Sequence, residues 1–162
     1  MASIKWCCGQ KDGIRLIEPN DNLALGYIKM AEDAIGTMSR ERGYNGMFAI
    51  SACYYSMYYS LYAILMKIGV KCEIHSCTLE FMKFALSEAY SSGDISIIKK
   101  AFDARSTAQY YADRVVTKED SDFIMSKAPY FLNKSKEILS RINEKDITMI
   151  RKRIREIGGN NQ

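Results

Sequence analysis

The stretch that most constrains this 162-residue chain runs from Met47 to Met66 and contains no Asp, Glu, Lys, Arg or Pro. Six side chains in and just beyond it recur at the four- and three-residue steps of one helix face: Ile50, Tyr54, Met57, Leu61, Ile64 and Ile68. A helix that is apolar on nearly all sides must be buried, either at the centre of a bundle or in a membrane. Five tyrosines and three serines in the stretch favour the bundle, because lipid offers their hydroxyls no partner.

Bulk composition predicts one ordinary helical domain, with 26% charged residues, 48% hydrophobic residues and only two prolines. The first residues lack the apolar core of a secretory signal, so a cytoplasmic protein with no membrane partner is expected. Five cysteines, an odd number, predict mostly free thiols in a reducing cytosol. The tyrosine-rich side of the central helix is the expected contact surface for a second copy of the chain.

Turn signals and apolar periodicity divide the chain into an irregular N-terminal segment (1–21), a helical bundle (22–143) and a basic C-terminal helix and tail (144–162). Within the bundle, helices are predicted to begin near Asn20, at Thr78, at an N-cap Asp94 and at a capping box starting with Thr117. Pro129 predicts a kink or a restart of the last of these. The expected fold is all-α, an antiparallel up-and-down bundle of five or six helices.

Most of the net charge of +4 lies between residues 145 and 157, where five basic side chains face two acidic ones. Such a patch suits nucleic acid or another acidic partner, and a solvated helix face is the simpler alternative. The candidate binding residues of this tail are Arg151, Lys152, Arg153 and Arg155.

Several motifs together resemble the HEPN domain, from about Asn22 to Ile142. They are the helix containing AxYYSMYYxLYAILMKxGV, a His-Ser turn, a short helix, an Arg near the end of the next helix and a last long helix. The resemblance is strongest to archaeal-type stand-alone members. It implies an up-and-down bundle that pairs as a two-fold homodimer. It also implies a frequent partner, a minimal nucleotidyltransferase, in toxin–antitoxin or defence systems.

Ribonucleases of this family carry Arg, then four to six residues, then His, and the two side chains meet across the dimer to cut RNA without metal. Arg105 matches the arginine, but Tyr110, Tyr111 and Ala112 stand where the histidine would be. A phenol, with a pKa of about 10, is a poor general base at pH 7. The resemblance therefore favours a dimeric binding module for RNA, nucleotide or a nucleotidyltransferase, with Arg105, Gln109 and Tyr111 as binding residues. The alternative is a ribonuclease in which Arg105 acts with Tyr110, Tyr111 or His75.

His75 is the only histidine, and its position in a turn is more typical of a helix-entry residue than of a catalytic one. An approach of His75 to Arg105 in space stays open, so His75 is also a candidate binding residue. Cys72, His75 and Cys77 form a weak metal candidate, because a fourth ligand would have to come from Cys7 or Cys8. A disulfide from Cys7 or Cys8 to this turn is the competing prediction. No cofactor is expected.

Overall fold

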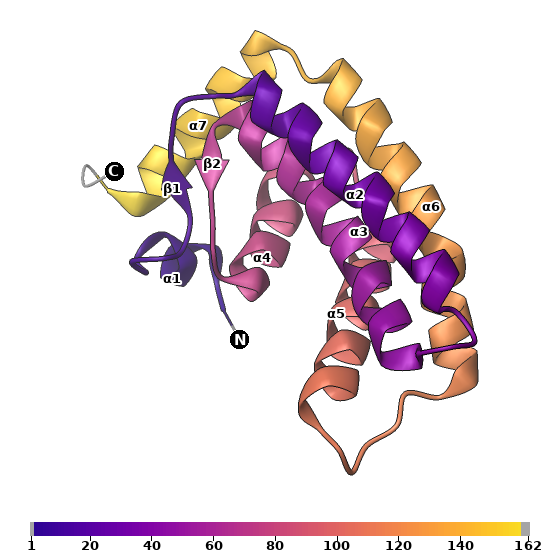
Figure 1. Ribbon diagram of the computed structural model, residues 1–162. Coiled ribbons are helices and arrows are strands. Elements are labelled where there is room, and N and C mark those ends of the chain that lie inside the picture. The colour runs from indigo at the N-terminus through magenta and orange to yellow at the C-terminus, as the bar shows by residue number, and fades with distance from the viewer. Residues whose placement is uncertain (1, 160–162) are drawn as a thin grey trace.

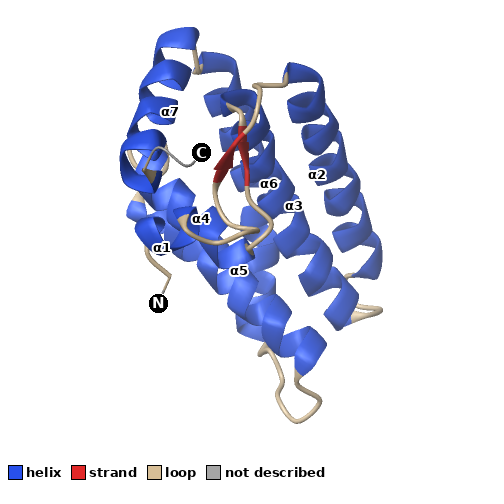
Figure 2. Cartoon of the chain, turned by 90° about the vertical axis from the view of Figure 1, so that its left-hand side faces the viewer, coloured by secondary structure: helices blue, strands red, loops and turns tan. Residues whose placement is uncertain are grey.

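The structure, a computed structural model, describes residues 2–159, which form seven helices and one two-stranded antiparallel sheet (Figures 1 and 2). The elements are α1 Ile4–Cys8, β1 Arg15–Leu16, α2 Asp21–Glu41, α3 Gly46–Ile68, β2 Val70–Lys71, α4 His75–Ala85, α5 Ser92–Tyr110, α6 Lys118–Arg141 and α7 Glu144–Gly158. The predicted all-α bundle is confirmed, with seven helices in place of five or six.

Helix α3 occupies the centre of the bundle, where it contacts α2, α5, α6 and α7. Figure 1 shows α2 and α6 lying along it. Every member of the predicted apolar face is buried, none more than 5% exposed. Asn45 caps the first turn by accepting the backbone N–H of Phe48, and Gly69 ends the helix with φ +80°. The described residues contain no helix with the length and hydropathy needed to cross a membrane.

Part of the tyrosine-rich side of α3 is covered within the chain. Tyr58 and Tyr62 are buried, and the ring of Tyr27 on α2 lies 4.8 Å from that of Tyr62, centroid to centroid. Tyr55 and Tyr59 stay half-buried. Much of the surface that the sequence assigned to a second copy is therefore covered by the chain itself. Of the α3 tyrosines, only Tyr55 and Tyr59 are partly exposed.

The N-terminal segment is more ordered than the sequence predicted. Ser3 caps the short helix α1, and β1 pairs antiparallel with β2 in the register Arg15↔Lys71 and Leu16↔Val70. Strands of two residues are too short to show a period-2 pattern, so sequence periodicity does not reveal them. Figure 2 shows this small sheet beside α4 and α7.

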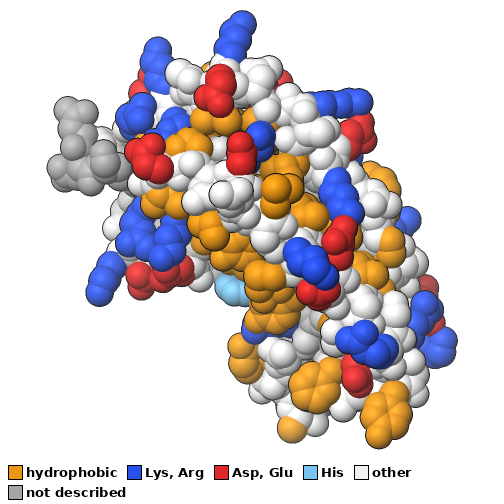
Figure 3. Space-filling view, turned by 45° about the horizontal axis from the view of Figure 1, so that its top comes forward, with side chains coloured by type: hydrophobic (Ala, Val, Ile, Leu, Met, Phe, Trp, Pro, Cys, Tyr) orange, Lys and Arg blue, Asp and Glu red, His pale blue; other side chains and the backbone are white. Residues whose placement is uncertain are grey.

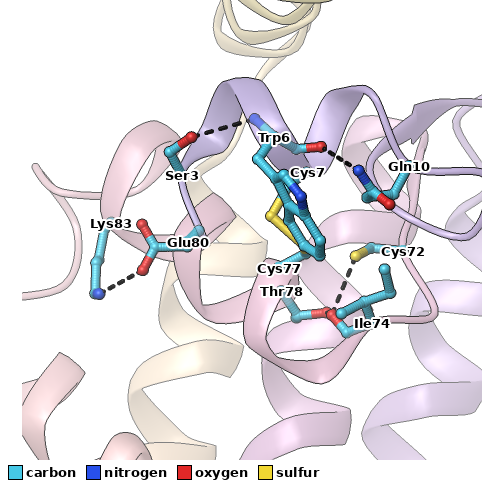
Figure 4. Close-up of a disulfide and its surroundings, with 10 residues drawn as sticks. All are labelled: Ser3, Trp6, Cys7, Gln10, Cys72, Ile74, Cys77, Thr78, Glu80 and Lys83. Atoms are coloured by element: carbon cyan, nitrogen blue, oxygen red, sulfur yellow. Dashed lines mark hydrogen bonds and ion pairs between the residues drawn. A yellow bond between two sulfur atoms is a disulfide. The ribbon is translucent and has the colours of Figure 1, made fainter. Parts of the chain in front are cut away.

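A disulfide joins Cys7 of α1 to Cys77 of α4, 70 residues along the chain (Figure 4). Both half-cystines are fully buried. Of the competing predictions for the cysteines, the disulfide from the N-terminal segment to the turn is the one that the structure contains. Cys8, Cys53 and Cys72 take no part in a disulfide. The bond fastens α1 to the first turn of α4.

The start predicted for α4 was wrong. The helix starts at His75, three residues before Thr78, because the Ile74 carbonyl already accepts the N–H of Thr78. It stops at Ala85, five residues before Tyr90, whose ring is 1% exposed and belongs to the core. Burial of Tyr90 in the turn is thus favoured over continuation of the helix.

The N-cap of α5 is Ser91, whereas the sequence predicted Asp94. The two residues form a reciprocal capping box, in which Asp94 accepts the N–H of Ser91 and Ser91 accepts that of Asp94. Lys134 and Tyr130 of α6 also donate to the buried Asp94 carboxylate. Burial by itself would raise the pKa of Asp94, but these hydrogen bonds hold that pKa at about 2.

Thr117 caps helix α6 by accepting the N–H of Asp120. The predicted capping box is only half formed among the described residues, because the Asp120 carboxylate pairs with Lys100. Pro129 lies inside the helix without a restart, so that part of the prediction was wrong. The neighbouring Ala128 and Phe131 are fully buried against the core. Tertiary packing therefore outweighs the hydrogen bond that proline cannot make.

Candidate functional site

Arg105 on α5 is a half-buried cation whose partners are all neutral. Its Nη2 donates to the Tyr55 hydroxyl at 2.9 Å, and its guanidinium carbon lies 5.5 Å from the Tyr55 ring centroid and 5.1 Å from that of Tyr110. Its Nε is buried and finds no acceptor in the described residues. Within residues 2–159 no carboxylate is among its contacts. The guanidinium is therefore available to an anion.

His75 and Arg105, two predicted residues that are 30 positions apart, both lie near the Tyr55 ring, whose centroid is 6.2 Å from that of His75 and 5.5 Å from the Arg105 guanidinium carbon. Its Nδ1 is 2.6 Å from the Tyr54 hydroxyl, and its ring stacks on Tyr58 at 4.3 Å with an interplanar angle of 6°. Burial and then the nearby positive charge of Arg105 lower the pKa of His75, so the imidazole is neutral at pH 7. Figure 3 shows the imidazole in pale blue at the surface, next to hydrophobic side chains.

The remaining candidates on α5 separate. Gln109 donates to the Ser51 hydroxyl at 2.9 Å and so joins the end of α5 to the beginning of α3. Tyr110 is 66% exposed and faces Arg105. Tyr111 instead pairs with Arg114, whose guanidinium carbon lies 4.2 Å from its ring centroid. Of the predicted residues, Arg105, His75 and Tyr110 therefore come together. Gln109 instead joins α5 to α3, and Tyr111 contacts Arg114.

Exposed aromatic and aliphatic side chains lie on the α2–α3 and α5–α6 loops and the helix turns next to them, at one end of the bundle (Figure 1). The Arg42–Asp122 ion pair joins the first of these loops to the start of α6. We call this surface the aromatic end, and it consists of Tyr44, Met47, Phe48, Tyr110, Tyr111, Val115 and Phe123. Lys100 and Lys127 lie 5.0 and 5.6 Å from the Phe123 ring centroid. Figure 3 shows large hydrophobic side chains and basic groups exposed together at the lower end of the molecule.

The basic tail divides into two structural and two exposed residues. Nη1 of Arg151 donates to the carbonyls of Ile17, Ile68 and Gly69. Arg153 donates to the carbonyl of Phe84 at 3.1 Å and covers its ring. The side chain of Lys152 is 73% exposed, and Arg155 is exposed as well. In Figure 1, α7 lies at the opposite end of the molecule from the α5–α6 loop, so this tail is remote from Arg105.

The weak metal candidate is not supported. Cys77 is bonded to Cys7, the Cys72 thiol donates to the Ile74 carbonyl at 3.3 Å, and the His75 Nδ1 is engaged by Tyr54 (Figure 4 shows the first two). The part of the chain that the structure describes contains no group of three or more His, Cys, Asp or Glu side chains arranged to hold a metal ion.

Two residues of the site were not predicted as such. Tyr54 and Tyr55 were assigned to core and dimer packing, yet one bonds His75 and the other bonds Arg105. The only local signal is that Tyr54 and Tyr55 are adjacent on the helix, which turns them toward neighbouring directions. Recognising their partners requires knowing that α4 and α5 pack on the same side of α3.

Comparison with known proteins agrees with this architecture. The profile of the HEPN domain matches residues 27–139, well over half of the chain. A protein of Methanocaldococcus jannaschii named "Putative toxin MJ0142" is 32% identical over 97 residues, which is 57% of this chain and 64% of that protein. The matched region thus spans less than two thirds of the relative. On the profile match and the helical architecture, the chain belongs to the HEPN domain family.

Proposed function

We propose that this HEPN protein is a binding module that recognises the phosphate groups of RNA or of a nucleotide at Arg105. The observation that carries the proposal is the absence of any carboxylate from the contacts of this half-buried guanidinium within the described residues. A structural arginine in such a place is normally paired, because an unpaired buried charge is costly. An arginine with neutral neighbours is suited to an anionic ligand that arrives from outside.

The aromatic end supports RNA over a small anion. Unpaired bases stack on exposed aromatic rings, and cations beside those rings attract the backbone. Tyr110, Tyr111 and Phe123 supply such rings, each with an Arg or Lys within 6 Å of its centroid. A strand whose phosphate sits at Arg105 then has stacking platforms within reach.

The likeness to a protein named as a toxin supports a role in a toxin–antitoxin or defence system. In such a system we propose that the chain acts as a homodimer with a minimal nucleotidyltransferase as partner. The half-buried Tyr55 and Tyr59 and the aromatic end offer apolar surface with polar tips, the composition of a contact surface between proteins.

Replacing Arg105 by alanine is expected to weaken binding of single-stranded RNA by about 30-fold, because one charge-assisted phosphate contact is lost. The slope of log affinity against log salt should become shallower by roughly 0.7 to 1, as for one phosphate fewer. Fluorescence anisotropy with labelled mixed-sequence RNA measures both the affinity and its salt dependence. Competition of the labelled RNA with ATP tests whether the site also binds a nucleotide. The control is Arg141→Ala, whose side chain is 76% exposed on α6 and which should change little. Equal losses in the two variants would contradict the proposal.

The second candidate function is a metal-independent ribonuclease, favoured by the position of a neutral His75 and of Arg105 near the same Tyr55 ring. Cleavage of end-labelled RNA in the presence of a chelator separates the two functions. For the binding module we expect wild type, Arg105→Ala and His75→Gln to cut no faster than a protein-free blank. Cutting by wild type that falls by 10²-fold or more in the His75→Gln variant would instead establish the enzyme.

A further inference from the structure

The Tyr54 hydroxyl and the His75 imidazole share one short hydrogen bond, 2.6 Å from oxygen to Nδ1. Tyr54 is fully buried, and burial raises the pKa of its phenol far above neutrality, so the hydroxyl keeps its proton. The imidazole is neutral for the reasons given above. The phenol therefore has one proton and the neutral ring has one, and either group could be the donor in this hydrogen bond.

Two distributions satisfy the distance. In the first, the phenol donates to Nδ1 and the ring proton resides on Nε2. In the second, Nδ1–H donates to the phenol oxygen, and the phenol proton must find another acceptor. Among the described residues the Tyr54 hydroxyl has no other hydrogen-bond partner. A buried hydroxyl proton left without an acceptor is costly, which favours the first distribution by about tenfold or more.

We infer that Tyr54 is a positioning residue that fixes His75 in the Nε2–H tautomer, so that the histidine offers a hydrogen-bond donor to the ligand of the Arg105 site. The inference rests on the proposed function for the identity of that ligand, but the tautomer itself does not depend on it. Tyr55 adds a further donor, because its oxygen accepts from Arg105 and its own proton is directed elsewhere.

A site made of donors selects the chemical class of its ligand. The guanidinium of Arg105, the Nε2–H of His75 and the hydroxyl of Tyr55 all donate, and none of the three is offset by a neighbouring carboxylate in the described chain. A tetrahedral phosphate with several free oxygens satisfies such a set, whether it is a backbone phosphodiester or a terminal phosphate. In this tautomer Nε2 has no lone pair with which to remove a 2′-hydroxyl proton, so His75 acts in recognition and not as a general base.

The test uses the full chain labelled with ¹⁵N-histidine, in which the single histidine makes the assignment unambiguous. A long-range ¹H–¹⁵N correlation spectrum at pH 7.5 is expected to show the proton on Nε2. Tyr54→Phe should give a mixture of both tautomers and a higher pKa of His75, because the hydrogen bond that favours the neutral ring is gone. The matched control is Tyr90→Phe, which removes another buried phenol, bonded to Ser135, and should leave the histidine spectrum unchanged.

Failure of the inference and failure of the proposed function are distinguishable in the same samples. A proton on Nδ1 in wild type overturns the inference, and this readout needs no variant to fold. Addition of inorganic phosphate or labelled RNA then tests the function separately. If neither ligand perturbs the His75 signals while Nε2 carries the proton, the tautomer stands and the phosphate site is rejected.

Discussion

Reduction of the Cys7–Cys77 disulfide is expected to lower the free energy of unfolding by about 4 kcal/mol. The bond closes a loop of 70 residues, and the entropy that such a cross-link removes from the unfolded chain corresponds to about this value. Both cysteines are fully buried, so reduction also leaves two thiols in the contact between α1 and α4. Urea denaturation of the folded protein, with and without dithiothreitol, measures the difference.

The control is a double variant, Cys7→Ala with Cys77→Ala, which should be as unstable as the reduced wild type and insensitive to dithiothreitol. Cys8→Ser, next to the bond but outside it, should keep the full response to the reductant. If the double variant still loses stability in dithiothreitol, the effect has another source and the stabilising role assigned to this bond is wrong.

Replacement of Arg151 by alanine is expected to lower the free energy of unfolding by about 3 kcal/mol. Its Nη1 lies 2.7 Å from the Ile17 carbonyl oxygen, 3.2 Å from that of Ile68 and 2.8 Å from that of Gly69. Two of these oxygens belong to the C-terminal end of α3, where a positive charge is favoured by the helix dipole. Without the guanidinium they lose a charged hydrogen-bond donor at a part-buried position.

The neighbouring Lys152→Ala variant is the control, because it removes the same charge from an exposed side chain and should change stability by less than about 0.5 kcal/mol. Thermal unfolding compares the two. RNA affinity of the folded Arg151→Ala protein should equal that of wild type, since this arginine already has its acceptors. If the Arg151→Ala variant had wild-type stability and weakened RNA binding, the structural role would be wrong and Arg151 would be a ligand contact, as the sequence suggested.

Two of the four basic residues of α7 have structural roles and two are exposed, and composition alone does not distinguish them. All four have the same charge and lie within five positions, so the sequence gives no reason to separate them. Arg151 and Arg153 reach carbonyls 134 and 69 residues away. Only the packing of α7 beside the ends of α3 and α4 reveals which arginines are structural.

In the candidate site, too, some features follow from the sequence and others depend on tertiary packing. The position of Arg105 on the apolar side of its helix follows from its spacing to Ile98 and Phe102, and the structure indeed half-buries it. Its proximity to His75, and the roles of Tyr54 and Tyr55, do not follow from any local pattern. These contacts depend on how α4 and α5 are oriented on α3.

By itself, the sequence determined the all-helical architecture, the central position of α3, and the helix starts marked by Asn20 and Thr117. Helical periodicity and capping are interactions between residues a few positions apart, so one chain read in order contains them. Only the tertiary structure decided the early start of α4, the Cys7–Cys77 bond, the structural use of Arg151 and the meeting of His75 with Arg105. Those features join residues that are distant in sequence or reflect packing that outweighs a local preference, and they exist only once the helices have packed.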